Sequence, residues 1–174
     1  MRIKQKKQER PNMDCVNLLT SILLCYPEIN VISFEPQDEV VFLSYTIERV
    51  LSDEERKQLK NLLEESLLSY YFLEKIEPGL NKIQVEVQEK FTFINMRRDV
   101  NTFSHTELKL IGEIIKAKFL KDMSKDIEPS ILSPDYPIGQ LENIDTLLRS
   151  LKINPATEHL IGLRQSGRVL VYNK

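Results

Sequence analysis

The sequence is poor in the residues from which catalytic and metal sites are most often built. It has two histidines, two cysteines, no tryptophan and five glycines among its 174 residues. None of them falls at the spacing of a zinc-protease helix, a paired-cysteine metal site, a dinucleotide-binding loop or a phosphate-binding loop. The sequence therefore predicts no catalytic residue, no metal ligand and no cofactor. An enzyme with an unrecognised site is kept as an alternative.

Long apolar runs are also missing. No run approaches the roughly 18 apolar residues that a membrane-spanning helix needs. The run 16–26 follows a charged start and superficially resembles a signal peptide. Asn17, Thr20 and Ser21 interrupt it, however, and no small-x-small cleavage site follows before Pro27. We therefore expect a cytoplasmic protein.

The cysteines and histidines are scattered. Cys15 and Cys25 fall on one predicted helix, about 15 Å apart along its axis, which is too far for a disulfide. We interpret them as small buried apolar residues, which fits a reducing compartment. His105 falls in the first turn of a predicted helix, where we expect it to be exposed, and His159 begins the last predicted hairpin.

What the sequence does contain is an internal repeat. Ser104 and Glu107 lie 52 positions after Ser52 and Glu55. Each S-x-x-E is a capping box, in which the Ser hydroxyl and the Glu carboxylate accept from backbone N–H groups that the first helical turn leaves free. An apolar residue precedes each Ser. These signals predict helices over 53–75 and 104–120.

Two predicted strands precede each of these helices. In the first copy they are 29–34 and 40–47, and in the second they are 83–87 and 91–96. The chain thus reads ββαββα, a circular permutation of the ferredoxin-like order, and we predict an α+β fold with four antiparallel strands and both helices on one face. Within the last strand, Phe91 and Phe93 are expected to pack in the core.

We divide the chain into four parts. A basic arm, 1–12, precedes an α+β core, 13–122, which opens with a helix that ends near Cys25. A connector, 123–157, is broken by prolines and holds one short predicted helix at about 141–151. A C-terminal β-hairpin occupies 158–174.

The N-terminal arm is strongly basic. Its five cations, against Glu9 alone, give 5 − 1 = +4, so the rest of the chain carries −2 − 4 = −6. A basic arm on an acidic body suggests an anionic partner such as RNA, a ribosome or acidic lipid, with a solvated terminus as the alternative. Its candidate contacts are Lys4, Lys6 and Lys7.

A pair of arginines ends the fourth predicted strand. Arg97 and Arg98 point to opposite faces because side chains alternate along a strand. One of them is expected to pair with Asp99 or with acids of the following helical turn. The other would reach solvent or an anion, so both are candidate RNA contacts.

The C-terminal hairpin is the main candidate for binding a partner. Apolar strands at 160–163 and 169–172 flank a turn that contains Ser166 and Gly167. Such a hairpin either extends the protein's own sheet or adds a strand to a protein partner or a second copy. The candidate partner-binding residues are Arg164, Arg168, Val169, Val171 and Tyr172.

Three segments are similar to a family of uncharacterised bacterial proteins of about this length. They are Tyr26-Pro27-Glu28-Ile29 after the first helix, Arg98-Asp99 before the second capping box, and the residues from Gly167 to Lys174. The resemblance implies an intracellular bacterial protein. It implies no activity.

Two functions follow from these observations. The first is a non-enzymatic intracellular interaction or adaptor module that binds a protein partner, or itself, through a sheet edge or the hairpin. The second is an RNA- or ribosome-associated protein that uses the basic arm with Arg97 and Arg98.

Overall fold

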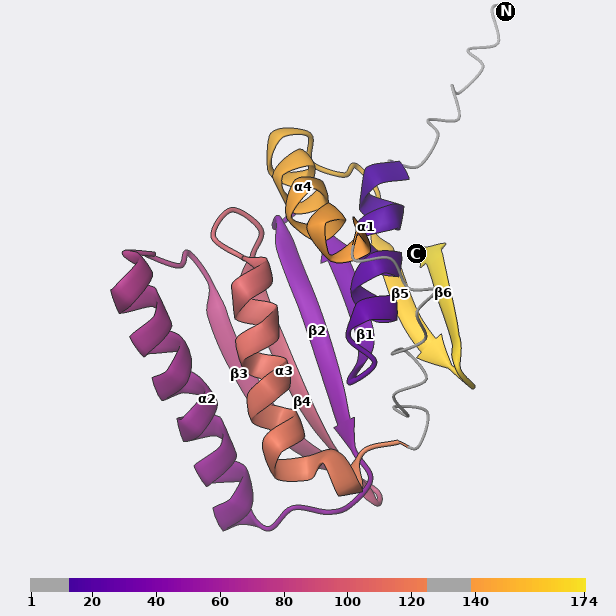
Figure 1. Ribbon diagram of the computed structural model, residues 1–174. Coiled ribbons are helices and arrows are strands. Elements are labelled where there is room, and N and C mark those ends of the chain that lie inside the picture. Colours follow the sequence, from indigo (N-terminus) through magenta and orange to yellow (C-terminus); the bar gives the residue numbers. More distant parts are fainter. Residues whose placement is uncertain (1–12, 125–138) are drawn as a thin grey trace, which may run out of the picture.

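The structure is a computed structural model that describes residues 13–124 and 139–174. Within these residues, one antiparallel sheet has six strands in the spatial order β3-β4-β2-β1-β5-β6, and the helices lie together on one of its faces (Figure 1). The strands are β1 (Ile29–Glu35), β2 (Val40–Ile47), β3 (Asn81–Gln88), β4 (Phe91–Asp99), β5 (Leu160–Gln165) and β6 (Arg168–Asn173). The helices are α1 (Met13–Cys25), α2 (Asp53–Glu74), α3 (His105–Phe119) and α4 (Gly139–Ile153), with a 3₁₀ turn, η1 (Leu120–Asp122), after α3.

The predicted α+β class is confirmed, but the predicted four-stranded sheet is wrong because the sheet has six strands. The C-terminal hairpin supplies the other two, since β5 pairs antiparallel with β1 from Val31↔Leu163 to Phe34↔Leu160. This pairing satisfies backbone groups that β1 would otherwise expose at a sheet edge. The helix predicted in the connector is confirmed as α4. The basic arm, with Lys4, Lys6 and Lys7, and the connector residues 125–138 lie outside the described residues.

On β4, the side chains that face the helices are not the ones that we predicted. Thr92, Ile94 and Met96 are buried beneath the helices, whereas Phe91 and Phe93 lie on the other face and are only partly buried. The pairing with β2 explains this, because it sets Ile94 beside the buried Tyr45. The core position predicted for Phe91 and Phe93 is therefore wrong.

The two capping boxes begin their helices in different ways. At α2 the box is complete: the Ser52 hydroxyl accepts from the Glu55 N–H at 3.2 Å, and the Glu55 carboxylate accepts from the Ser52 N–H at 2.8 Å. At α3 only the Ser104 half forms, with 3.2 Å to the Glu107 N–H. The Glu107 carboxylate turns into the core instead.

Helix α1 packs on α4 and covers the strands β1, β5 and β6 (Figure 1). Gly162 on β5 allows this close approach, because a Cβ there would lie 2.9 Å from Leu23 Cδ1 on α1. Lys152 on α4 donates to the Phe103 carbonyl at 2.9 Å and so joins α4 to the start of α3. Among the described residues, no helix is both long enough and apolar enough to cross a bilayer.

Candidate functional site

The β5–β6 hairpin closes through a two-residue turn. Ser166 and Gly167 both have positive φ, 50° and 73°, as a type I′ turn requires. Gln165 and Arg168 are the pair that flanks the turn. Such a turn matches the right-handed twist of the strands, so it holds β6 at the end of the sheet.

The hairpin register decides which backbone groups of β6 are free. A two-residue turn closes on a hydrogen-bonded pair, and such pairs alternate along an antiparallel ladder. Arg168, Leu170 and Tyr172 therefore bond to β5, while the N–H and C=O groups of Val169 and Val171 point outward. Since β6 is the last strand in the sheet order, these outward groups line an edge that no described strand covers.

The sheet face opposite the helices is apolar near this edge. Leu170 and Tyr172 are 46% and 47% exposed, which is high for apolar strand residues. They lie beside Leu163 and Ile161 of β5 across the hairpin, and Val31 of β1 continues the row. We call the outward backbone edge of β6 together with Leu170 and Tyr172 the β6 edge site.

Four of the five predicted partner-binding residues belong to the hairpin's outer strand. Tyr172 and Arg168 are exposed, whereas Val169 and Val171 turn partly buried side chains toward the helices and offer their backbone groups to the edge. Arg164 differs, because its guanidinium donates to the carbonyl of Leu23 near the end of α1. That contact satisfies a carbonyl that the helix leaves free, which is a common role for arginine at a C-terminus.

Arg97 and Arg98 lie on opposite faces, as predicted. Arg97 reaches the face without helices and pairs with Glu35 at 2.6 Å. Arg98 is fully buried and bonds both to Asp99, at 2.6 Å, and to Glu107. The prediction that one of the two arginines pairs with Asp99 or with an acid of the following turn is confirmed, since Arg98 pairs with both Asp99 and Glu107. In this position Arg98 presents no donor to an external anion.

The Arg98 cluster is extensively hydrogen-bonded. The hydroxyl of Tyr71 donates to Glu107 Oε1 at 2.8 Å, and the Arg98 guanidinium lies 5.1 Å from the centre of the Tyr71 ring. Thr102 accepts from Arg98 at 3.1 Å. Burial acts to raise the pKa of Asp99, but hydrogen bonds from Leu80, Thr102 and Arg98 outweigh it and lower that pKa. The cluster joins β4, α2 and α3.

A second polar cluster begins at the loop between α1 and β1. His105 is buried rather than exposed, which corrects our expectation, and its ring contacts the Tyr26 hydroxyl at 2.5 Å and Asp145 at 3.3 Å. Glu28 is buried against Gly112 of α3, with Lys116 at 3.7 Å. Burial raises the pKa of Glu28. No metal-binding group of three or more His, Cys, Asp or Glu residues occurs within 13–124 or 139–174.

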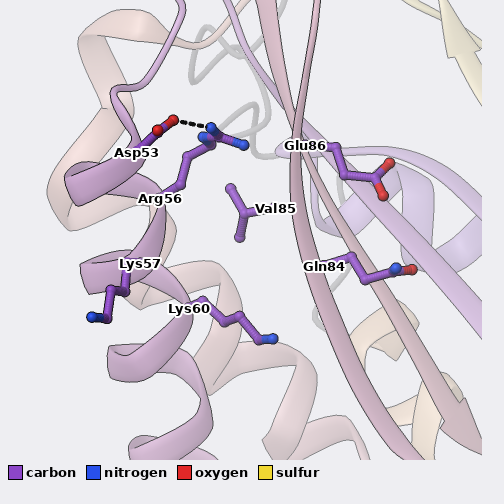
Figure 2. A pocket seen from close by; sticks show the side chains of 7 residues that line it. All are labelled: Asp53, Arg56, Lys57, Lys60, Gln84, Val85 and Glu86. Atoms are coloured by element: carbon purple, nitrogen blue, oxygen red, sulfur yellow. Dashed lines mark hydrogen bonds and ion pairs between the residues drawn. The ribbon is translucent and has the colours of Figure 1, made fainter.

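At the other end of the sheet, a groove lies between α2 and the edge strand β3. Its volume is about 410 Å³. Figure 2 shows its lining, which is Asp53, Arg56, Lys57, Lys60, Gln84, Val85 and Glu86. No sequence signal indicates this groove, because the charged residues of α2 meet β3 only in the folded structure.

Comparisons of the chain with protein-family models, with curated proteins and with solved structures give no match. The resemblance to an uncharacterised bacterial family therefore stays a prediction.

Proposed function

We propose that this chain is a non-enzymatic cytoplasmic interaction module that receives a strand from a protein partner, or from a second copy of itself, at the β6 edge site. The observation that carries this proposal is the position of β6. It is the terminal strand of the sheet, and its outward backbone groups adjoin two exposed apolar side chains. Strand addition would satisfy those groups and cover both side chains together.

The composition of β6 supports strand addition. Proteins usually protect exposed edges with proline, bulges, inward-pointing charges or very short strands. In β6 the register with β5 is unbroken, and the strand RVLVYN contains neither proline nor an acid. Its only charge, on Arg168, lies at the turn. Each apolar cross-strand pair that an added strand formed with Leu170 or Tyr172 would contribute roughly 0.2–1 kcal/mol.

A second copy can pair with β6 without opposing like charges. An antiparallel arrangement centred on Leu170 sets Leu170 against its own copy and Val169 against Val171. Arg168 then lies opposite Tyr172, where a guanidinium can contact an aromatic ring. A two-fold axis generates every contact twice, as in most homodimers.

Substitution of Val171 by proline tests the proposal. Proline removes the outward N–H of Val171 but leaves the hydrogen bonds of Leu170 and Tyr172 to β5 intact. Sedimentation velocity over a range of concentrations should show a wild-type dimer and a Val171→Pro monomer. If the wild type is monomeric, a protein co-purified with it should be lost from Val171→Pro. Val85→Pro on β3 is the matched control at the opposite edge, and equal behaviour of the two variants would refute the proposal.

One observation favours RNA binding as a second candidate function. Phe91 and Phe93 lie on the face without helices, with ring centroids 6.4 Å apart, and Lys90 lies 5.5 Å from the Phe91 ring centroid. Partly exposed aromatic rings beside cations are the means by which sheets stack single-stranded bases.

The matching test measures binding of a labelled single-stranded RNA by fluorescence anisotropy at several salt concentrations. RNA binding predicts an affinity that falls as salt rises, and a loss with Phe93→Ala. Phe72→Ala is the control, because Phe72 is 84% exposed on α2, away from this face. No binding at low salt would remove this candidate.

A further inference from the structure

The groove between α2 and β3 runs along the second edge of the sheet that no described strand covers. β3 is the first strand in the sheet order, and its eight residues pair with β4 in an unbroken register from Asn81↔Arg98 to Gln88↔Phe91. Residues 89 and 90 form a two-residue connection, so Gln88 and Phe91 are a hydrogen-bonded pair. By alternation, the backbone groups of Ile83, Val85 and Val87 point outward. β3 can therefore receive a strand along its length.

The side chains of β3 divide between the two faces. In Figure 2, Val85 points toward α2, while Gln84 and Glu86 point to the other side of the strand. Ile83 and Val87 share the face of Val85, because side chains alternate. A strand added beside β3 would likewise turn every second side chain toward α2.

Helix α2 supplies two cations where those side chains would lie. Arg56 and Lys60 extend from α2 toward β3, whereas Lys57 points away from the strand (Figure 2). Arg56 pairs with Asp53 through one Nη atom, and a guanidinium carries five N–H donors. Lys60 lies 3.7 Å from Glu64, which is longer than a hydrogen bond. Both cations thus retain donor capacity toward the groove.

These cations select between incoming strands. An apolar or basic strand would remove water from Arg56 and Lys60 without supplying a carboxylate to replace that water, which is costly. A strand with carboxylates on the face turned to α2 would pair with both. Charge complementarity of this kind determines specificity mainly by penalising the wrong partner.

We propose that the groove between α2 and β3 binds an acidic, extended segment of a partner protein. The segment adds antiparallel to β3 through the outward backbone groups of Ile83, Val85 and Val87. Its carboxylates, at alternate positions, contact Arg56 and Lys60. This site is separate from the β6 edge site and does not depend on it.

The probe is a labelled eight-residue peptide that alternates valine and glutamate, blocked at both ends, with a valine–lysine peptide as its counterpart. Fluorescence anisotropy should show that the wild-type chain binds the glutamate peptide and does not bind the lysine peptide. The affinity should fall as salt rises, because exposed charge pairs are screened.

Charge reversal at one lysine inside the groove and one outside it provides a matched comparison. We expect Lys60→Glu to weaken binding of the glutamate peptide about tenfold or more, and to gain binding of the lysine peptide. Lys109→Glu makes the same change in net charge at an exposed position of α3 that does not line the groove. It should change the affinity less than about twofold. Equal effects of the two substitutions would mean general electrostatic attraction and would overturn the proposal.

Val85→Pro tests strand addition directly. It removes an outward N–H without breaking the β3–β4 ladder, so it should abolish peptide binding while far-UV circular dichroism stays unchanged. Val171→Pro should bind the peptide like the wild type. Peptide binding that persists in Val85→Pro, or that is lost in Val171→Pro instead, would overturn the proposal. The second result would place the peptide at the β6 edge site. If Val85→Pro does not fold, the comparison of the two lysines still decides the question.

Discussion

The two copies of the internal repeat use the same local signal for different purposes. In the first, Glu55 stays at the surface, completes the capping box of α2 and pairs with Arg49 at 2.9 Å. In the second, Glu107 is fully buried and bonds to Arg98 and Tyr71 rather than to the backbone of Ser104. A four-residue pattern that starts a helix can thus also place a carboxylate in a protein core, and its tertiary surroundings decide which role it takes.

The largest difference between the copies should appear when each glutamate is removed. Glu107→Ala leaves Asp99 as the one carboxylate that pairs with the buried Arg98 among the described residues, and loss of one partner of a buried pair costs about 3–5 kcal/mol. Glu55→Ala removes only surface contacts and should be much milder. Urea denaturation of both variants measures the difference. Equal losses would mean that the Arg98–Glu107 pair contributes no more than a surface contact.

The second difference in stability concerns the positions five residues after each glutamate, which are Gly112 after Glu107 and Lys60 after Glu55. Gly112 lies against Glu28, and a Cβ at Gly112 would collide with the Glu28 carboxylate. Gly112→Ala should therefore destabilise the fold by up to about 2 kcal/mol, because overpacking costs about 1–3 kcal/mol and the helix propensity of alanine offsets about 1 kcal/mol of it. Its counterpart in the first repeat, Lys60→Ala, should change stability by less than about 0.5 kcal/mol.

Thermal denaturation checks this pair of variants. Combining Gly112→Ala with Glu28→Ala should recover part of the loss, because it removes the colliding carboxylate. If the double variant recovers none of the lost stability, contact with Glu28 does not explain the effect of Gly112→Ala.

Replacing either capping serine should lower stability by a similar amount. Ser52→Ala and Ser104→Ala each remove an acceptor for the first helical turn, at a cost of about 1 kcal/mol. Ser104 also contacts the Tyr70 hydroxyl at 2.8 Å, so its removal should be the more costly of the two. Denaturation midpoints compare them, and Ser66→Ala within α2 serves as a serine-to-alanine control. A larger effect at Ser52 would contradict this order.

The smallest effect concerns the dependence of stability on pH. Burial raises the pKa of Glu28, so the folded state holds its proton more tightly than the unfolded chain does. The stability contribution of protonated Glu28 is complete below the ordinary carboxyl pKa of about 4.3 and is lost as pH rises through the raised value. We expect Glu28→Gln to remove this loss.

Two other carboxylates have lowered pKa values, so the pH dependence of stability must distinguish Glu28 from them. The pKa of Glu55 is lowered, chiefly by hydrogen bonding from the Ser52 backbone and from Arg49, and that of Asp99 is lowered as well. These two groups stabilise the fold above their ordinary pKa, and that contribution disappears as pH falls. Urea titrations between about pH 4 and pH 8 should therefore show Glu28→Gln gaining on the wild type only toward higher pH. A constant difference would contradict the assignment to Glu28.

Local sequence signals determined the elements of this protein. The S-x-x-E pairs begin α2 and α3, alternation marks the strands, and the short turn at Ser166 and Gly167 forms the last hairpin. Each of these signals acts through residues a few positions apart. For that reason they could be read without knowledge of the fold.

The faces and partners of those elements were decided only by the tertiary structure. Strand β4 alternates Phe91 and Phe93 with Thr92, Ile94 and Met96, so either set could have faced the helices by pattern alone. Pairing with β2 selects the second set. The same choice buries Arg98, which requires Glu107 from α3 as its partner.

The candidate sites depend on the same long-range choices. Pairing of β5 with β1 makes β6 a sheet edge, and the packing of α2 beside β3 brings Arg56 and Lys60 to the other edge. Hydrogen bonding across a sheet and the pairing of buried charges join residues far apart in the sequence. Local patterns therefore specify which strands and helices form, and the tertiary structure specifies which of their surfaces remain free to bind.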